Sequence, residues 1–174
     1  MSQNKTGCGC CGGESCCDNP QDEARDEVKI DFLFLDLETC GRCRGTEDNL
    51  ESAIDEVATV LGNAGYHVAL NKTHISSMDL AIANRFLSSP TIRVNGKDIS
   101  LEVTESDCTD CGDICGDSVD CRTWTYQGEQ YDVPPKEMIV RAILSEVFSP
   151  SKDCETGDVE YRLPDNLRTF FNGK

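Results

Sequence analysis

The sequence predicts an α/β domain with the element order βαβαββα, a cysteine-rich insertion before the last helix and a disordered N-terminal arm. Three observations support this fold class. An apolar strand leads into a Cys-x-x-Cys pair and an amphipathic helix, a second strand and helix follow, and an Asn-Gly turn joins two β-branched runs. The 174 residues suffice for one core with additions.

The composition divides the chain into three parts. The N-terminal part carries five cysteines among Gly, Glu and Asp and has almost nothing to bury, which predicts a flexible arm. Apolar residues between 161 and 171 predict that the C-terminal tail docks on the core or on a second subunit. The predicted parts are an arm at 1–27, an α/β domain at 28–150 with a cysteine-rich insertion at 104–133, and a tail at 151–174.

The first strand of the domain is predicted within 28–37. It is nearly continuous in apolar residues, as is typical of a strand covered on both faces. After the cysteine pair, apolar residues at helical spacing predict a helix that ends near Gly62. That apolar stripe consists of Leu50, Ile54, Val57 and Leu61. A second strand is predicted over 66–70.

The second half of the domain begins with a helix that Ser76 or Ser77 caps and that ends before Pro90. Its predicted buried face carries Met78, Ile82 and Phe86. A hairpin over 91–101 turns at Asn-Gly, which favours a type I′ turn. The last helix opens at the proline pair 134–135, because proline at the first helical position needs no amide partner.

Cys40 and Cys43 lie where the first strand delivers the chain to the start of a helix. The unpaired amides of a helix N-terminus stabilise a thiolate, so Cys40 is the predicted nucleophile. Cys43 lies on the same first turn and can close a disulfide with it. Arg42 adds positive charge that should lower the pKa of Cys40. Half of a zinc site is the alternative interpretation, but the strand-to-helix position favours redox chemistry.

The chain resembles the thioredoxin superfamily. The resemblance rests on Cys40-Gly41-Arg42-Cys43 at the motif position and on Ser89-Pro90-Thr91, which matches the loop that carries the cis-proline of the family. It covers about residues 28–103 and resumes in the helix at 135–148. The resemblance implies a sheet of two parallel and two antiparallel strands with helices on both faces. It also implies a cis Pro90 opposite the dithiol, which aims the Ser89 backbone at a substrate strand and keeps metal away from the cysteines.

Three positions depart from the pattern of that family. Thr39 stands where thioredoxins carry Trp, Arg42 stands where they carry Pro, and Phe34 stands at the place of their buried acid. Asp36 is the nearest substitute for that acid. The motif is closer to glutaredoxin-like or small anaerobe-type thioredoxins, and the whole chain is similar to the cysteine-rich thioredoxin-like disulfide reductases found in anaerobic methanogens.

The insertion carries four cysteines among Gly and Asp residues that cannot build an apolar core. They are Cys108, Cys111, Cys115 and Cys121. Their thiolates would hold the loop around Zn²⁺ or an iron–sulfur cluster, or Cys108 and Cys111 would form a second dithiol that relays electrons to or from the first. The spacing leaves these alternatives open. The thiols of the arm either bind soft metals, exchange disulfides or matter little: Cys8, Cys10, Cys11, Cys16 and Cys17.

These residues predict a protein disulfide reductase. Cys40 attacks the disulfide of a protein substrate, and Cys43 resolves the mixed disulfide. The backbone at Ser89 and Pro90 docks the substrate, and an upstream disulfide reductase or low-potential electron donor restores the dithiol. The exchange itself requires no cofactor. The alternative is a protein that binds or carries Zn²⁺, an iron–sulfur cluster or a toxic soft metal on a thioredoxin-like scaffold.

The composition limits the partners. A formal net charge of −16, with 32 acidic side chains, argues against nucleic acid and anionic membranes as partners. The sequence shows no signal-peptide pattern at its start and no apolar run of membrane-spanning length, so we expect a cytoplasmic protein whose 12 cysteines stay reduced. A homo-oligomer is compatible with the sequence.

Overall fold

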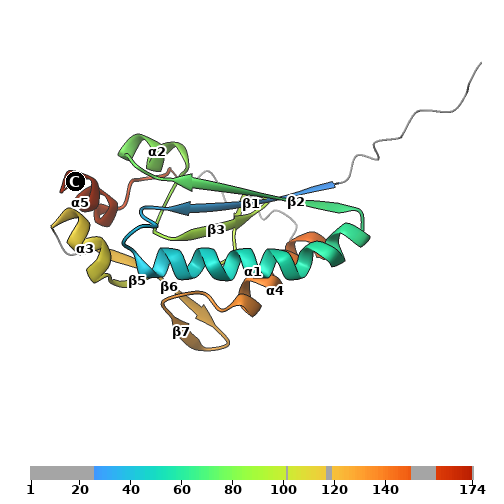
Figure 1. The fold of residues 1–174 in the computed structure, drawn as a ribbon. Coiled ribbons are helices and arrows are strands. Elements are labelled where there is room, and N and C mark those ends of the chain that lie inside the picture. The colour runs from blue at the N-terminus through green and yellow to red at the C-terminus, as the bar shows by residue number, and fades with distance from the viewer. Residues whose placement is uncertain (1–25, 101, 117–118, 150–159, 174) are drawn as a thin grey trace, which may run out of the picture.

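The computed structural model describes residues 26–100, 102–116, 119–149 and 160–173. Its strands are β1 (Asp26–Phe34), β2 (Tyr66–His74), β3 (Thr91–Val94), β4 (Lys97–Asp98), β5 (Thr104–Asp107), β6 (Asp120–Tyr126) and β7 (Glu129–Tyr131). Its helices are α1 (Gly41–Asn63), α2 (Met78–Ala83), α3 (Thr109–Cys115), α4 (Lys136–Phe148) and α5 (Asp165–Asn172). The fold is mixed α/β, as predicted (Figure 1).

The main sheet has the strand order β2-β1-β3-β4. β1 pairs in parallel with β2 and antiparallel with β3, and β4 pairs antiparallel with β3. The adjacent residues Phe32 and Leu33 of β1 point to opposite faces, and both are buried. This burial explains the continuous apolar run, because α1 and α4 cover one face of the sheet and α2 lies on the other (Figure 1). The superfamily assignment itself stays a prediction.

The predicted helices differ from the structure mainly at α2. The stripe on α1 is confirmed, with Leu50, Val57 and Leu61 buried and Ile54 half-buried. α2 ends at Ala83, earlier than predicted, and its Ile82 is 51% exposed. Arg85 follows with a left-handed φ of 46°, which turns the chain so that Phe86 enters the core from beyond the helix. The predicted buried face of this helix was therefore wrong at Ile82.

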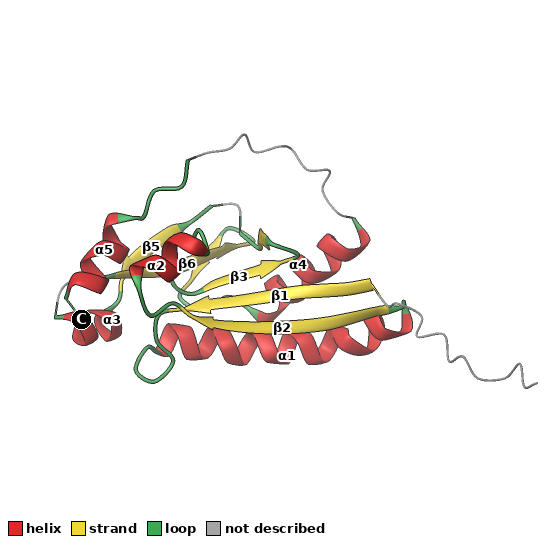
Figure 2. Ribbon diagram, turned by 90° about the horizontal axis from the view of Figure 1, so that it is seen from above, coloured by secondary structure: helices red, strands yellow, loops and turns green. Residues whose placement is uncertain are grey.

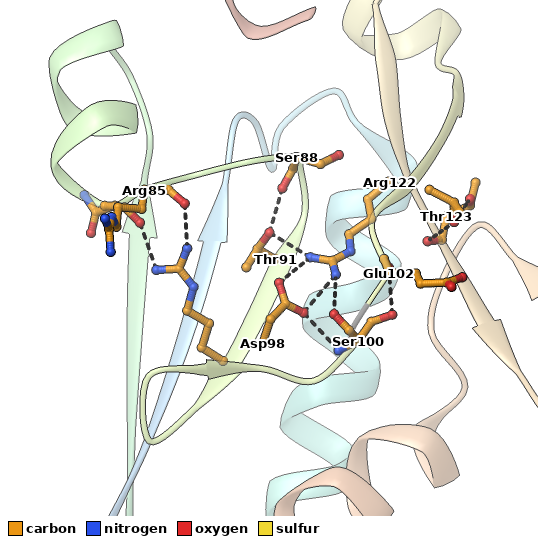
Figure 3. A network of polar contacts seen from close by, with 11 residues as sticks. Arg85, Ser88, Thr91, Asp98, Ser100, Glu102, Arg122 and Thr123 are labelled. Atoms are coloured by element: carbon orange, nitrogen blue, oxygen red, sulfur yellow. Dashed lines mark hydrogen bonds and ion pairs between the residues drawn. The ribbon is translucent and has the colours of Figure 1, made fainter. Parts of the chain in front are cut away.

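The insertion forms a second sheet of order β5-β6-β7. Arg122 on β6 fastens it to the main sheet: its fully buried guanidinium binds both carboxylate oxygens of Asp98 at 2.8 Å and the hydroxyl of Thr91 at 3.0 Å (Figure 3). The same guanidinium lies 4.4 Å from the ring centre of Trp124, which is also buried. The buried residues of the insertion, among them Val119 and Trp124, belong to the same hydrophobic core as those of the main sheet.

The C-terminal residues dock on their own chain. α5 buries Leu167 and Phe170, and Asn166 exchanges hydrogen bonds with the backbone of Asp120 at 2.9 and 2.6 Å. Figure 2 shows α5, α3 and α2 gathered at one end of the main sheet. No helix in the described ranges is long and apolar enough to cross a membrane. The arm cysteines, from Cys8 to Cys17, lie outside the described residues.

Candidate metal centre

Four cysteines converge where α1 begins. Cys40 is the N-cap of α1, Cys108 is the N-cap of α3, Cys111 lies in the first turn of α3, and Cys121 lies on β6. Their Sγ atoms all lie within 4.8 Å of one another, and those of Cys111 and Cys121 are 3.1 Å apart. All four residues are at most 4% exposed. None of the six cysteines in the described part of the chain forms a disulfide.

A tight turn between β1 and α1 places Cys40. One carboxylate oxygen of Asp36 accepts hydrogen bonds from the backbone amides of Thr39 at 2.5 Å and Cys40 at 3.2 Å. The Cys40 sulfur then accepts from the amide of Cys43 at 3.4 Å, in the manner of a helix N-cap. Asp36, which the sequence offered as a substitute for a buried acid, therefore shapes this turn.

The insertion places the other three sulfurs. The amide of Cys108 donates to the carbonyl of Val119 at 2.9 Å, which closes the loop around α3. Because Cys108 and Cys111 are three residues apart at a helix start, their side chains lie on one side. Cys121 reaches them from β6, where it pairs with Ser106 of β5.

Two further contacts join α1 to the insertion. Asp110 on α3 accepts a hydrogen bond from the Gly41 amide at 2.7 Å, although 69 positions separate them. The guanidinium of Arg42 donates to the carbonyl oxygens of Ser106 at 3.3 Å, Cys121 at 3.2 Å and Asp107 at 3.0 Å. It also pairs with Asp132 at 3.1 Å, and its side chain is 15% exposed. These contacts hold the helix that carries Cys40 against the segment that carries the other sulfurs.

Hydrogen bonds between the four thiols shift the pKa of each one. Thiol hydrogen bonds from Cys108, then Cys111 and Cys121, lower the pKa of Cys40 against the opposing effect of burial. Hydrogen bonds with Cys111 and Cys121 lower the pKa of Cys108 to about 7. The pKa values of Cys111 and Cys121 are raised, in each case chiefly by the hydrogen bond with Cys108. Hydrogen bonds among the four sulfurs are therefore the main cause of the lowered pKa of Cys40, and the effect of Arg42 on that pKa stays a prediction.

Cys115, the fourth cysteine predicted in the insertion site, is not among the four that converge. Its sulfur lies 3.9 Å from the carbonyl oxygen of Gly112. Four residues of helix separate it from Cys111 by a rise of about 6 Å, which carries it away from the cluster. Cys40 takes its place. The sequence grouped Cys115 with the insertion cysteines because spacing compares only residues that are near one another along the chain. The signal that could have pointed to Cys40 is that Cys108 and Cys111 form a second Cys-x-x-Cys pair, also at the start of a helix.

Cys43 and the cis-proline loop lie beside the cluster. The Ser89–Pro90 bond is cis, and the hydroxyl oxygen of Ser89 lies 3.4 Å from the sulfur of buried Cys43 and accepts from the Leu35 amide at 3.0 Å. The pKa of Cys43 is raised chiefly by its hydrogen bond with Cys40, and burial adds to the effect. The carbonyl of Ser89 already accepts from the Arg122 amide at 2.7 Å. β6 thus occupies the backbone acceptor that the resemblance reserved for a substrate strand.

The donor set fits a single soft metal ion. Zinc bound by four thiolates is tetrahedral, with Zn–S bonds of about 2.3 Å and therefore sulfurs about 3.8 Å apart. The sulfur–sulfur distances, 3.1 Å for Cys111 and Cys121 and at most 4.8 Å for all pairs, bracket that spacing. Burial of all four residues is typical of a closed site with no open coordination position. Sulfur donors also exclude Mg²⁺ and Ca²⁺, which prefer oxygen.

Comparison with known proteins places the site within one family region. The model of a family described as "Domain of unknown function (DUF2703)" matches residues 28–143, a range that holds all four converging cysteines. No curated protein and no solved structure matches the chain.

Proposed function

The chain belongs to the DUF2703 family, and we propose that it binds one soft metal ion through the thiolates of Cys40, Cys108, Cys111 and Cys121. The observation that carries this proposal is the convergence of four buried sulfurs from three separate segments of the chain. Packing alone gives no reason for four cysteine side chains from separate segments to meet, because each sulfur fills little space in a core.

Zn²⁺ is the first ion to test. Tetrathiolate sites with tetrahedral geometry hold zinc or a single iron ion. An iron–sulfur cluster distributes its cysteine ligands over several irons, whereas here every sulfur lies within 4.8 Å of the other three. That spacing supports one central ion. The metal would hold the insertion against α1, because Cys40 lies outside the insertion and the other three ligands lie within it.

The experiment is metal analysis of the anaerobically purified full-length chain. Because other thiols could bind metal, it is performed in a serine background, in which the cysteines outside the described residues are replaced: Cys8, Cys10, Cys11, Cys16, Cys17 and Cys154. We expect about one equivalent of metal in this background. Cys111→Ser should lose it, whereas the matched control Cys115→Ser should keep it.

Two results would contradict the proposal. One is a serine background that takes up no Zn²⁺, Co²⁺ or Fe²⁺ while it remains folded by circular dichroism. The other is equal metal content in Cys111→Ser and Cys115→Ser, because the metal would then be bound elsewhere.

A thiol–disulfide oxidoreductase, acting on a disulfide-containing protein, is a second candidate. It is supported by the position of Cys40 at the start of α1 with Cys43 on the first turn, and by the similarity to the thioredoxin superfamily. Both cysteines are fully buried, so a substrate must first displace the insertion. Dithiothreitol-driven insulin reduction should therefore appear only after metal removal, and Cys40→Ser should abolish it. Full activity of that variant would exclude this candidate.

A further inference from the structure

We propose that Cys43 is the redox trigger of the metal site: oxidation of Cys40 and Cys43 to a disulfide withdraws one ligand and releases the metal. This inference rests on the proposed tetrathiolate. It assigns to Cys43 a role that metal binding leaves open, because the four sulfurs that converge do not include its own.

The geometry supports Cys43 as the partner of Cys40. The two residues flank the first turn of α1, and the Cys43 amide already donates to the Cys40 sulfur at 3.4 Å. Cys43 is fully buried, and its sulfur contacts the Ser89 hydroxyl at 3.4 Å. That contact holds the thiol beside the ligand set without making it a ligand. Two cysteines at this helical spacing are within reach of a disulfide after a small rotation of their side chains.

The oxidation balances with a peroxide as the oxidant. Hydrogen peroxide is small enough to enter a site that a protein disulfide cannot reach. The Cys40 thiolate attacks one peroxide oxygen, which forms an S–O bond, breaks the O–O bond and releases hydroxide. The Cys43 sulfur then attacks the Cys40 sulfur, the S–S bond forms, and the S–O bond breaks with the thiol proton leaving in water. Two electrons pass from the two sulfurs to the peroxide.

Loss of Cys40 as a ligand should separate the metal from the start of α1. Cys40 precedes α1 and lies outside the insertion, whereas the other three proposed ligands, Cys108, Cys111 and Cys121, lie within it. The remaining three thiolates with an open fourth position should not retain the metal, as we expect for Cys111→Ser, and a competing chelator takes it up. Reduction of the disulfide restores the fourth ligand.

The test uses the full-length serine background loaded with Zn²⁺ and treated with hydrogen peroxide. Zinc transfer to a chromophoric chelator is followed in time, and disulfides are mapped by mass spectrometry after alkylation. Three proteins are compared: the background itself, Cys43→Ser and the control Cys115→Ser. We expect Cys43→Ser to release zinc at least about tenfold more slowly, because its Cys40 sulfenic acid lacks the one neighbouring thiol that is not itself proposed to bind the metal. The background and the control should release zinc together with a Cys40–Cys43 disulfide, and a reductant should restore binding.

The outcomes separate the two proposals. If the background never loads zinc, the tetrathiolate proposal has failed before oxidant is added. If zinc loads but Cys43→Ser releases it as fast as Cys115→Ser, or if the first disulfide joins Cys111 to Cys121, the trigger role of Cys43 is overturned while the metal site stands. Zinc content before oxidation shows whether Cys43→Ser is folded, and Cys43→Ala provides a second variant if it is not.

Discussion

Arg42 links segments that carry the proposed metal ligands and lie far apart in the chain. Its guanidinium reaches three carbonyls of β5 and β6, and this is the contact that a lysine cannot reproduce, because one ammonium lacks the planar fork. We expect Arg42→Ala to weaken zinc affinity by about 10- to 100-fold, the usual effect of losing a residue that supports metal ligands. Arg42→Lys should recover little of it. Competition with a chelator of known affinity measures both.

Arg44→Ala is the matched control for that prediction. It removes the same charge from an exposed position two residues along α1. If Arg42 acted by lowering the pKa of Cys40 through its charge, Arg42→Lys would behave like the wild type, and Arg44→Ala would also weaken binding. That pattern would restore the role that the sequence suggested for Arg42.

Replacement of glycine by alanine should have opposite effects on stability at two positions of α1, Gly62 and Gly45. A Cβ on Gly62 would meet no atom within 4 Å, so Gly62→Ala should raise the free energy of unfolding by about 0.5–1 kcal/mol. A Cβ on Gly45 would lie 2.9 Å from Val133, whose branched side chain cannot easily move away. Gly45→Ala should therefore be less stable than Gly62→Ala by about 1–3 kcal/mol. Urea unfolding measures both, and equal stabilities would contradict this packing.

At the scale of elements, a buried ion pair joins the second sheet to the main sheet. Arg122 is fully buried, whereas the Asp98 side chain is 27% exposed. Asp98→Ala would leave the guanidinium buried and without its carboxylate, and should lower the free energy of unfolding by about 3 kcal/mol. Urea unfolding of the metal-loaded protein tests this. Asp48→Ala, which removes an exposed carboxylate from α1, should change stability little, and a similar loss in both variants would point to net charge instead.

The elements of the main sheet could be predicted because their signals are local. The apolar run of β1, the stripe on α1 and the Asn95-Gly96 turn each require only neighbouring residues, and the turn has the positive φ angles of 50° and 82° that the dipeptide favours. α2 was less predictable, because a left-handed residue at Arg85 interrupts a periodic pattern that continues to Phe86. Nothing in the local pattern marks that interruption.

The candidate site could be predicted only in part, because it is assembled across the fold. The sequence identified both Cys-x-x-Cys pairs and Cys121 as reactive or metal-binding. It could not bring Cys40 to Cys108, because that contact depends on the Gly41–Asp110 hydrogen bond and on β6 crossing the Ser89 loop. The spacing of residues in one sequence indicates neither contact. The predicted ligand set therefore included Cys115 in place of Cys40.

At the scale of the whole molecule, the contacts that fasten the insertion fall on three consecutive residues at the start of β6. Asp120 binds Asn166 of α5, Cys121 belongs to the proposed metal site and accepts a hydrogen bond from Arg42, and Arg122 pairs with Asp98. The main sheet has a different source of stability, since Ile30, Phe32 and Ile92 are buried between helices. Removal of the metal should therefore loosen the insertion without unfolding the sheet.

Hydrogen exchange provides the measurement for that expectation. After chelation, the amides of β5 and α3 should exchange faster, because the thiolates that order them lose the ion they share. The amides of β1 should remain protected, since their ladder lies between two paired strands. Cys111→Ser without chelator should reproduce the pattern, and Cys115→Ser should not. An equal loss of protection in β1 and α3 would mean that the metal supports the global fold. A ligand that stabilises only the insertion cannot protect amides of the main sheet that open independently of the insertion.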